Sequence, residues 1–315
     1  MLRRTFLTAF VALMTPALLF AQVKPVALKL KFADGRKTES KVEIKVKQLL
    51  ELNGTPVNTS NESFATVETV CGKRKADGSI TLTQETKQQQ TNLDIQGNQI
   101  NFDSANPDVQ APIAQLQPII DALKFGLKAT KTFTLDAKNK VTKVALPDGL
   151  EVPEFVKAEF SDDSLKKEFD EQTKVIPTTP IKKGDTWELE TESQLGQGQV
   201  MTFRKKFTYE GVVEKDGTKL HRITVKVLGV DLALVNSPLP FKIAAANLNG
   251  EKSKEEILFD NKTGIVVQSN SDVKITGELK FDIMGNEIAG KLDLNMISNT
   301  KSKVVNNSLD SKSPA

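Results

Sequence analysis

Apolar and polar residues alternate along most of this chain with a period of two, which is typical of β-strands that bury one face. Short turn sequences rich in glycine, aspartate and asparagine separate the alternating runs, and such sequences favour tight connections between neighbouring strands. Examples of these turns are Asp34-Gly35, Asn53-Gly54, Asp77-Gly78 and Gly196-Gln197-Gly198. The pattern therefore predicts long antiparallel strands joined by hairpins.

One stretch has a different period. Residues 113–127 carry apolar side chains at spacings of three and four, which predicts a helix with one buried face. Pro112 and Pro118 both suit a first helical turn, so the helix begins at one or the other. Its apolar stripe consists of Ile113, Leu116, Ile120, Leu123 and Leu127. After the helix the period returns to two in a hairpin that turns at residues 136–139, and a lone amphipathic helix among strands has to bury its stripe against a sheet.

A second, shorter helix is predicted after Ser161, because serine is a favoured N-cap and Asp162 and Asp163 suit a first turn. The proline-containing connector of residues 178–184 is the best candidate boundary between two halves. We therefore divide the chain into a leader (1–21), an N-terminal β-rich half with the central helix and hairpin (22–178), an antiparallel C-terminal half (179–302) and a disordered polar tail (303–315).

The hairpin around Gln197 has the clearest predicted register. Folding the chain there sets Glu190 opposite Arg204. Glu188 then lies opposite Lys206, so that ion pairs line one face and apolar residues the other. This pairing explains the acidic run as a solvated sheet face rather than as a group of catalytic carboxylates.

These elements predict an α+β fold, mainly β, with long twisted antiparallel strands in two meander-like halves. One main helix packs on a concave sheet face, and the expected shape is half-barrel-like, by analogy with periplasmic lipoprotein carriers. Residues 228–249 are apolar and contain Pro238 and Pro240, so we expect a loop there. This loop either covers one end of the sheet or closes over a cleft as a lid.

The first 21 residues match a secretory signal peptide. Arg3 and Arg4 precede an apolar run that Pro16 interrupts, and Ala21 precedes a suitable cleavage point. The run is short for a membrane span, although an uncleaved anchor stays open as an alternative. Its removal lowers the net charge from +3 to about +1, which leaves no strong electrostatic footprint for nucleic acid. We expect an exported bacterial protein, periplasmic or secreted, with no transmembrane segment after cleavage.

The chain is poor in the residues that carry most metal and nucleophile chemistry. Its single Cys71 cannot form an internal disulfide, and we expect it to be buried as a small hydrophobic residue. Its single His221 has no second histidine with which to bind a metal, and we expect a hydrogen-bonded structural residue. Since no nucleophile elbow, phosphate loop or zinc motif occurs, we assign no catalytic, cofactor-binding or metal-binding residue.

The stretch Pro180-Ile181-Lys182-Lys183-Gly184-Asp185-Thr186-Trp187 resembles an uncharacterised family of exported bacterial proteins. In that family a signal peptide precedes long strands, a short helix and a hairpin, and a turn of this kind opens a second set of strands. The resemblance implies a β-rich fold and supplies no activity or catalytic residue.

The sequence favours a non-enzymatic cell-envelope protein that binds a lipid-like or other apolar small molecule, or a partner protein of the envelope. Two alternatives stay open, a hydrolase that uses two facing carboxylates and a structural or assembly protein that acts through strand edges. The expected binding site is an apolar cleft between helix and sheet. Its expected lining is Leu116, Ile120, Leu123, Leu127, Trp187 and Phe207.

Overall fold

The computed structural model describes residues 24–196, 198–235 and 242–306, so the predicted leader of residues 1–21 lies outside the described residues. The first half supplies the strands β1 (Lys37–Leu52), β2 (Thr55–Cys71), β3 (Ile80–Ile95), β4 (Asn98–Asp103), β5 (Lys131–Leu135) and β6 (Val141–Ala145). The second half supplies β7 (Thr186–Gly196), β8 (Gln199–Lys215), β9 (Thr218–Leu234), β10 (Lys242–Asp260), β11 (Ile265–Ile283) and β12 (Asn286–Asn306). The helical elements are η1 (Ala114–Leu116), α1 (Gln117–Lys128), η2 (Glu154–Val156) and α2 (Asp162–Thr173).

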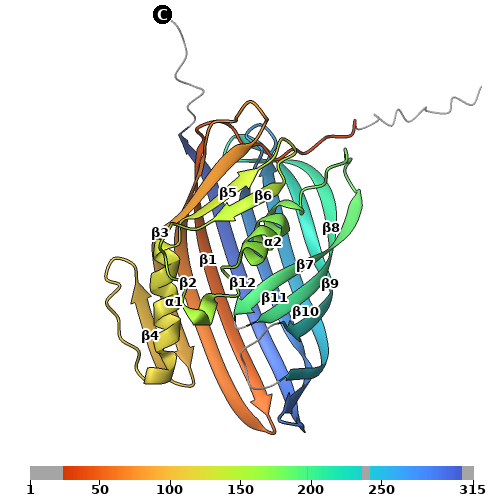
Figure 1. Ribbon diagram of the computed structural model, residues 1–315. Coiled ribbons are helices and arrows are strands. Elements are labelled where there is room, and N and C mark those ends of the chain that lie inside the picture. Colours follow the sequence, from red (N-terminus) through yellow and green to blue (C-terminus); the bar gives the residue numbers. More distant parts are fainter. Residues whose placement is uncertain (1–23, 197, 236–241, 307–315) are drawn as a thin grey trace, which may run out of the picture.

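All these strands belong to a single twelve-stranded sheet with the order β6-β5-β3-β2-β1-β12-β11-β10-β9-β8-β7, in which β4 pairs with β3. β1 pairs with β12 along its whole length, so strands of both halves are joined into one sheet. The sheet is strongly curved and stays open between β6 and β7, its two edges in the described part of the chain (Figure 1). The predicted mainly β, half-barrel-like fold is therefore confirmed.

The predicted hairpin register is also confirmed. Glu190 pairs with Arg204 and Glu188 pairs with Lys206 across β7 and β8. The turn residue Gly198 has a positive φ of 76°, a conformation that glycine adopts without a steric penalty. Local pattern thus fixed this register correctly, because a shift by one residue would have exposed the apolar face.

The main helix α1 starts with Pro118 in its first turn, which matches the later of the two predicted starts. Ile120 of α1 and Leu116 of the preceding η1 are buried in one cluster with Ile100 of β4. Leu93 of β3 packs on the same cluster. Leu93 pairs with Asn61 of β2, and Asn61 pairs with Val46 of β1, so the three side chains share one face of the sheet. Val46 packs inside the half-barrel. Helix α1 therefore covers part of the concave face.

The second helix, α2, bridges the two edges of the sheet. Ser161 caps it as predicted, since its side chain accepts a hydrogen bond from the Ser164 backbone N–H. On one side Leu165 is buried in a cluster with Phe133 and Val144 of the β5–β6 hairpin. On the other side α2 reaches Glu192 of β7, through contacts described below, and Figure 1 shows the helix between β6 and β7. A helix thus spans the gap that backbone pairing leaves open.

Strands extend into two segments that were predicted to be irregular. Within the stretch predicted as a loop, residues 228–249, β9 continues to Leu234 and β10 begins at Lys242. Pro238 and Pro240 lie outside the described residues. The predicted loop was too long, because it included the end of β9 and the start of β10. In the predicted tail, β12 continues to Asn306, which pairs with Lys37, and residues 307–315 lie outside the described residues.

Candidate functional site

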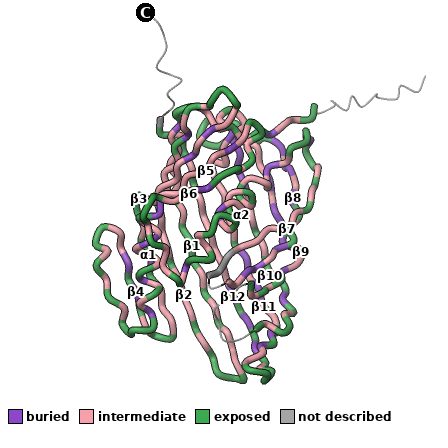
Figure 2. The backbone as a smooth tube through the Cα atoms, in the orientation of Figure 1, coloured by how far each residue is buried: buried purple, intermediate pink, exposed green. Residues whose placement is uncertain are grey.

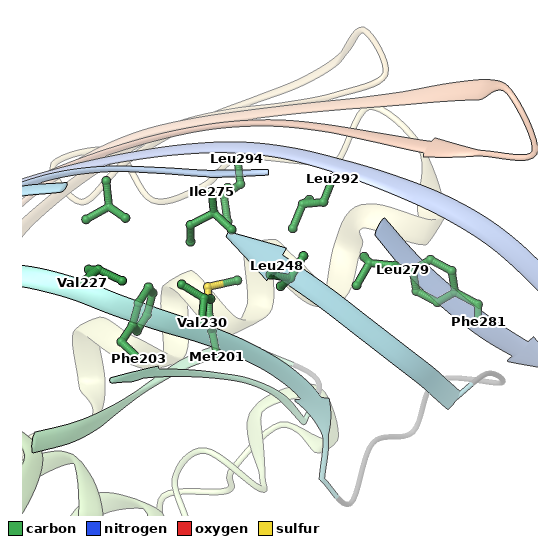
Figure 3. Close-up of a cluster of buried hydrophobic side chains, with 11 residues drawn as sticks. Met201, Phe203, Val227, Val230, Leu248, Ile275, Leu279, Phe281, Leu292 and Leu294 are labelled. Atoms are coloured by element: carbon green, nitrogen blue, oxygen red, sulfur yellow. The ribbon is translucent and has the colours of Figure 1, made fainter. Parts of the chain in front are cut away.

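Two apolar clusters occupy the concave face of the half-barrel. The first, which we call the Ile275 cluster, joins two facing walls of the curved sheet (Figure 3). Met201, Phe203 and Val230 of β8 and β9 point toward Ile275 and Leu294 of β11 and β12. The second, the Phe207 cluster, contains Phe207, Tyr209, Ile223, Val225, Ile257 and Phe259 among its buried members. These clusters hold the walls of the half-barrel together.

Between the clusters, one cross-strand row of the concave face has serine at three of its five positions. It runs Ser63, Ile44, Ser298, Ser271 and Glu255 across β2, β1, β12, β11 and β10, and we call it the central row. The adjoining row is similar, with Ala65, Val42, Thr300 and Ser269 in register. Short side chains on a concave surface cannot reach across to fill the space in front of them.

The effect of these short side chains is visible on strand β1. It lies in the middle of the sheet, yet none of its residues is buried (Figure 2). Its inward residue Ile44 is 38% exposed, whereas Ile275 on the same face of β11 is fully buried. Val46 and Leu50, further along the same inner face, are partly buried against the Ile275 cluster, so the exposure is confined to Ile44. An exposed apolar residue on the inner face of a central strand is unusual, because central strands normally carry the core.

A buried ion pair lies at the β10 end of the central row. Lys205 of β8 and Glu255 of β10 approach to 2.8 Å between Nζ and Oε2, and their side chains are 18% and 10% exposed. Lys205 Nζ also lies 5.1 Å from the centre of the Phe203 ring. The other carboxylate oxygen, Glu255 Oε1, is enclosed and has no hydrogen-bond partner among the described residues. Such an atom is costly to leave unsatisfied, so it calls for an explanation.

The residues predicted to line an apolar cleft fall into two places. Leu116 and Ile120 are buried under α1, where Leu123 and Leu127 are half-buried on the same helix. Trp187 and Phe207 stack with their rings 5.4 Å apart at the far side of the half-barrel. The structure thus places these residues in separate clusters, and a common lining stays a prediction.

Sequence reasoning missed Lys205, Glu255 and Ile44, although a signal for two of them was present. Lys205 lies on the apolar face of β8 by simple alternation, between Phe203 and Phe207. Glu255 likewise shares the face of Ile257 on β10. Charged residues at two inward positions of separate strands could have predicted a buried pair. No local signal marked Ile44, because its exposure depends on the residues across the sheet.

Cys71 and His221 have the predicted surroundings. Cys71 is buried, and burial raises the pKa of its thiol against the opposing effect of Arg36. His221 Nδ1 and the Tyr209 hydroxyl are 2.7 Å apart, and burial lowers the pKa of the imidazole while Asp260 raises it. A structural role suffices for both residues.

Other parts of the surface supply no clearer chemistry. A hollow of about 340 Å³ lies on the outer face of β1 to β4, lined mainly by polar residues such as Lys45, Glu62, Asn92 and Gln99. No group of three or more His, Cys, Asp or Glu residues suited to a metal ion occurs in the described ranges. Among the described helices, none is both long and apolar enough to cross a membrane.

Comparison with solved structures finds distant likenesses. A structure reported for lipid–protein interactions in lipovitellin has 11% identity and a TM-score of 0.38 over 90% of this chain and 27% of that chain. This chain therefore spans about a quarter of lipovitellin. An outer membrane channel from Pseudomonas putida F1 has 7% identity and a TM-score of 0.27, covering 90% of this chain and 100% of that one. A DUF1329 family protein from Desulfovibrio piger has 7% identity and a TM-score of 0.14, covering 88% and 90%.

No curated protein matches the chain in sequence. The family comparison is more specific and includes the Pro180 to Trp187 stretch. Residues 137–266 match the model of a family of unknown function (DUF6263), which confirms the resemblance to an uncharacterised family.

Proposed function

We propose that this protein is a non-catalytic binding protein whose concave face holds an extended apolar small molecule. The observation that carries the proposal is the exposure of Ile44 on a central strand, between two clusters that are otherwise closely packed. Burying such a surface against an apolar chain would be favourable, because apolar area removed from water stabilises the complex by roughly 25 cal/mol per Å².

The shape of the site favours a narrow ligand over a folded partner. The strand that carries Ile44, β1, lies between α1 on one side and the wall of β7 to β9 on the other (Figure 1). We therefore favour a single hydrocarbon chain as the occupant over a folded protein, which would have to present a thin projection to reach Ile44. Ligand sites are commonly concave and mostly apolar, with a few polar groups that fix orientation.

Binding is favoured over hydrolysis by the surroundings of Glu255. The group that faces this inward carboxylate at 2.8 Å is the ammonium of Lys205. Hydrolysis by two carboxylates would require a second acid facing it across a cleft. We also propose, from residues 1–21, that the protein acts outside the cytoplasm, in the periplasm or the medium.

The proposal is tested by titrating the purified mature protein with a hydrophobic naphthylamine dye. We expect saturable binding, and we expect Ile44→Lys to weaken it about tenfold, because a ligand over Ile44 would have to desolvate the new charge. Leu49→Lys is the matched control, since Leu49 lies on the same strand, is 39% exposed and faces the outer side. Non-saturable binding, or equal effects of the two substitutions, would refute the proposal.

A further inference from the structure

We infer that the molecule held on the concave face is amphipathic and carries an uncharged, hydrogen-bond-donating head that Lys205 and Glu255 recognise. The inference rests on the proposed function and adds a chemical class of ligand to it. It is carried by the unpartnered oxygen of Glu255 and by the position of the ion pair at the end of the central row.

The central row connects the Lys205–Glu255 ion pair with the exposed Ile44. From Ile44 the central row passes Ser298 and Ser271 and ends at Glu255, which is three strands away. At about 4.8 Å per strand, this is a path of roughly 14 Å. A single-chain lipid lying across the strands could therefore cover Ile44 with its chain and bring its head to the ion pair.

The hydrogen bonding of Lys205 and Glu255 indicates which head group the ligand carries. Lys205 donates to Glu255 Oε2, while Oε1 lacks a donor. A hydroxyl or amide head would supply one once the Glu255 side chain turns this oxygen toward the concave face. A carboxylate head has no donor at neutral pH and would bring a second negative charge toward the carboxylate. An ammonium head would bring a second positive charge toward Lys205. Since the pair is neutral, the uncharged head is the one of these three kinds that leaves the enclosed site neutral.

The simpler reading is that the pair is only structural. It lies where the Ile275 and Phe207 clusters meet, with Phe203 of the first cluster beneath Lys205 and Val225 of the second opposite Glu255. Under this reading, substitution of either charge alters stability and has no effect on which head group is preferred. Head-group preference therefore separates the two readings.

The experiment measures displacement of the naphthylamine dye by three molecules with the same chain, namely mono-oleoylglycerol, oleate and oleylamine. The wild-type protein should favour mono-oleoylglycerol over both charged molecules by about tenfold. Glu255→Gln should shift the preference toward oleate, because Lys205 is left without its counter-charge. Lys205→Met should shift it toward oleylamine for the converse reason. Glu256→Gln is the control, because Glu256 is the next residue, faces outward and lies 3.9 Å from Arg222.

A double variant covers the case in which a single substitution prevents folding. Lys205→Met with Glu255→Met removes both charges together, and replacing a buried pair by apolar residues commonly preserves stability. This double variant should still bind the dye, and mono-oleoylglycerol and oleate should displace the dye from it equally well. Equal displacement by all three molecules from the wild-type protein, or an unchanged order in the variants, would overturn the inference. Absence of any saturable dye binding would instead refute the proposed function itself.

Discussion

Ile44 and Ile275 are the same residue type on the same concave face, yet their surroundings differ. Ile275 is fully buried in a cluster with Met201 and Val230 of the facing wall and with Leu294, its partner on the adjacent strand β12. Ile44 has serine at both neighbouring positions, Ser63 and Ser298, and keeps 38% of its surface exposed. The difference arises from the length of the side chains around each residue.

This contrast predicts a large difference in stability between two identical substitutions. Ile275→Ala should lower the free energy of unfolding by about 2–5 kcal/mol, because it removes buried methyl groups and leaves a cavity. Ile44→Ala should lower it by less than about 1 kcal/mol, because little buried contact is lost. Urea unfolding followed by circular dichroism measures both. Equal losses would mean that Ile44 is covered in solution.

At the scale of elements, helix α2 connects the two edges of the sheet, which do not pair with each other. The Glu192 backbone N–H on the β7 edge donates to Glu171 Oε2 of the helix at 3.0 Å, and Lys167 Nζ lies 2.5 Å from the Glu192 carboxylate. Near the other edge, Lys131 of β5, the strand next to β6, pairs with Glu168 at 2.9 Å. The helix thus satisfies an edge amide and connects both ends of the sheet, which also shields those edges from pairing with other chains.

Loss of the α2 N-cap should loosen this bridge. Ser161→Ala should cost about 1 kcal/mol of stability, because the first turn of the helix loses a side-chain acceptor. Hydrogen exchange should then speed up in peptides that contain Glu192, since its amide depends on the helix. Ser161→Asp keeps a good cap and should leave both quantities close to wild type. Exchange at Glu192 that is unchanged in the alanine variant would show that α2 does not hold the β7 edge.

At the scale of the whole molecule, the pairing of β1 with β12 turns two meanders into one curved sheet. Ser40 and Ser302 are cross-strand partners with their hydroxyl oxygens 2.8 Å apart, although 262 positions separate them in the chain. The concave face exists only because of this junction, since Ile44 and Ser298 of the central row lie on its two sides.

A disulfide across the junction tests this topology. Ser40→Cys with Ser302→Cys should oxidise readily to an intramolecular bond, because directly opposed residues on one sheet face have the spacing that a disulfide requires. Lys41→Cys with Ser302→Cys should not, because the two side chains point to opposite faces. Thiol titration and non-reducing electrophoresis report the outcome. Failure of the first pair to oxidise would contradict the pairing of β1 with β12.

The sequence by itself determined what depends on neighbours along the chain. Alternation placed the strands, the Gln197 turn set Glu190 opposite Arg204, and Ser161 marked the start of α2. These features follow from local periods and turn chemistry, which act over a few residues. The same local rules misjudged residues 228–249, where two prolines outside the described residues hid the strands on either side.

Only the tertiary structure decided which inward residues meet. The central row joins residues from five strands, and Glu255 gains its partner Lys205 from a strand that is not its neighbour in the sheet. Likewise, the role of α2 as a bridge depends on how far the sheet curves. Curvature and long-range register sum small twists over the whole sheet, so no local stretch encodes them. The exposure of Ile44 is therefore a property of the assembled sheet.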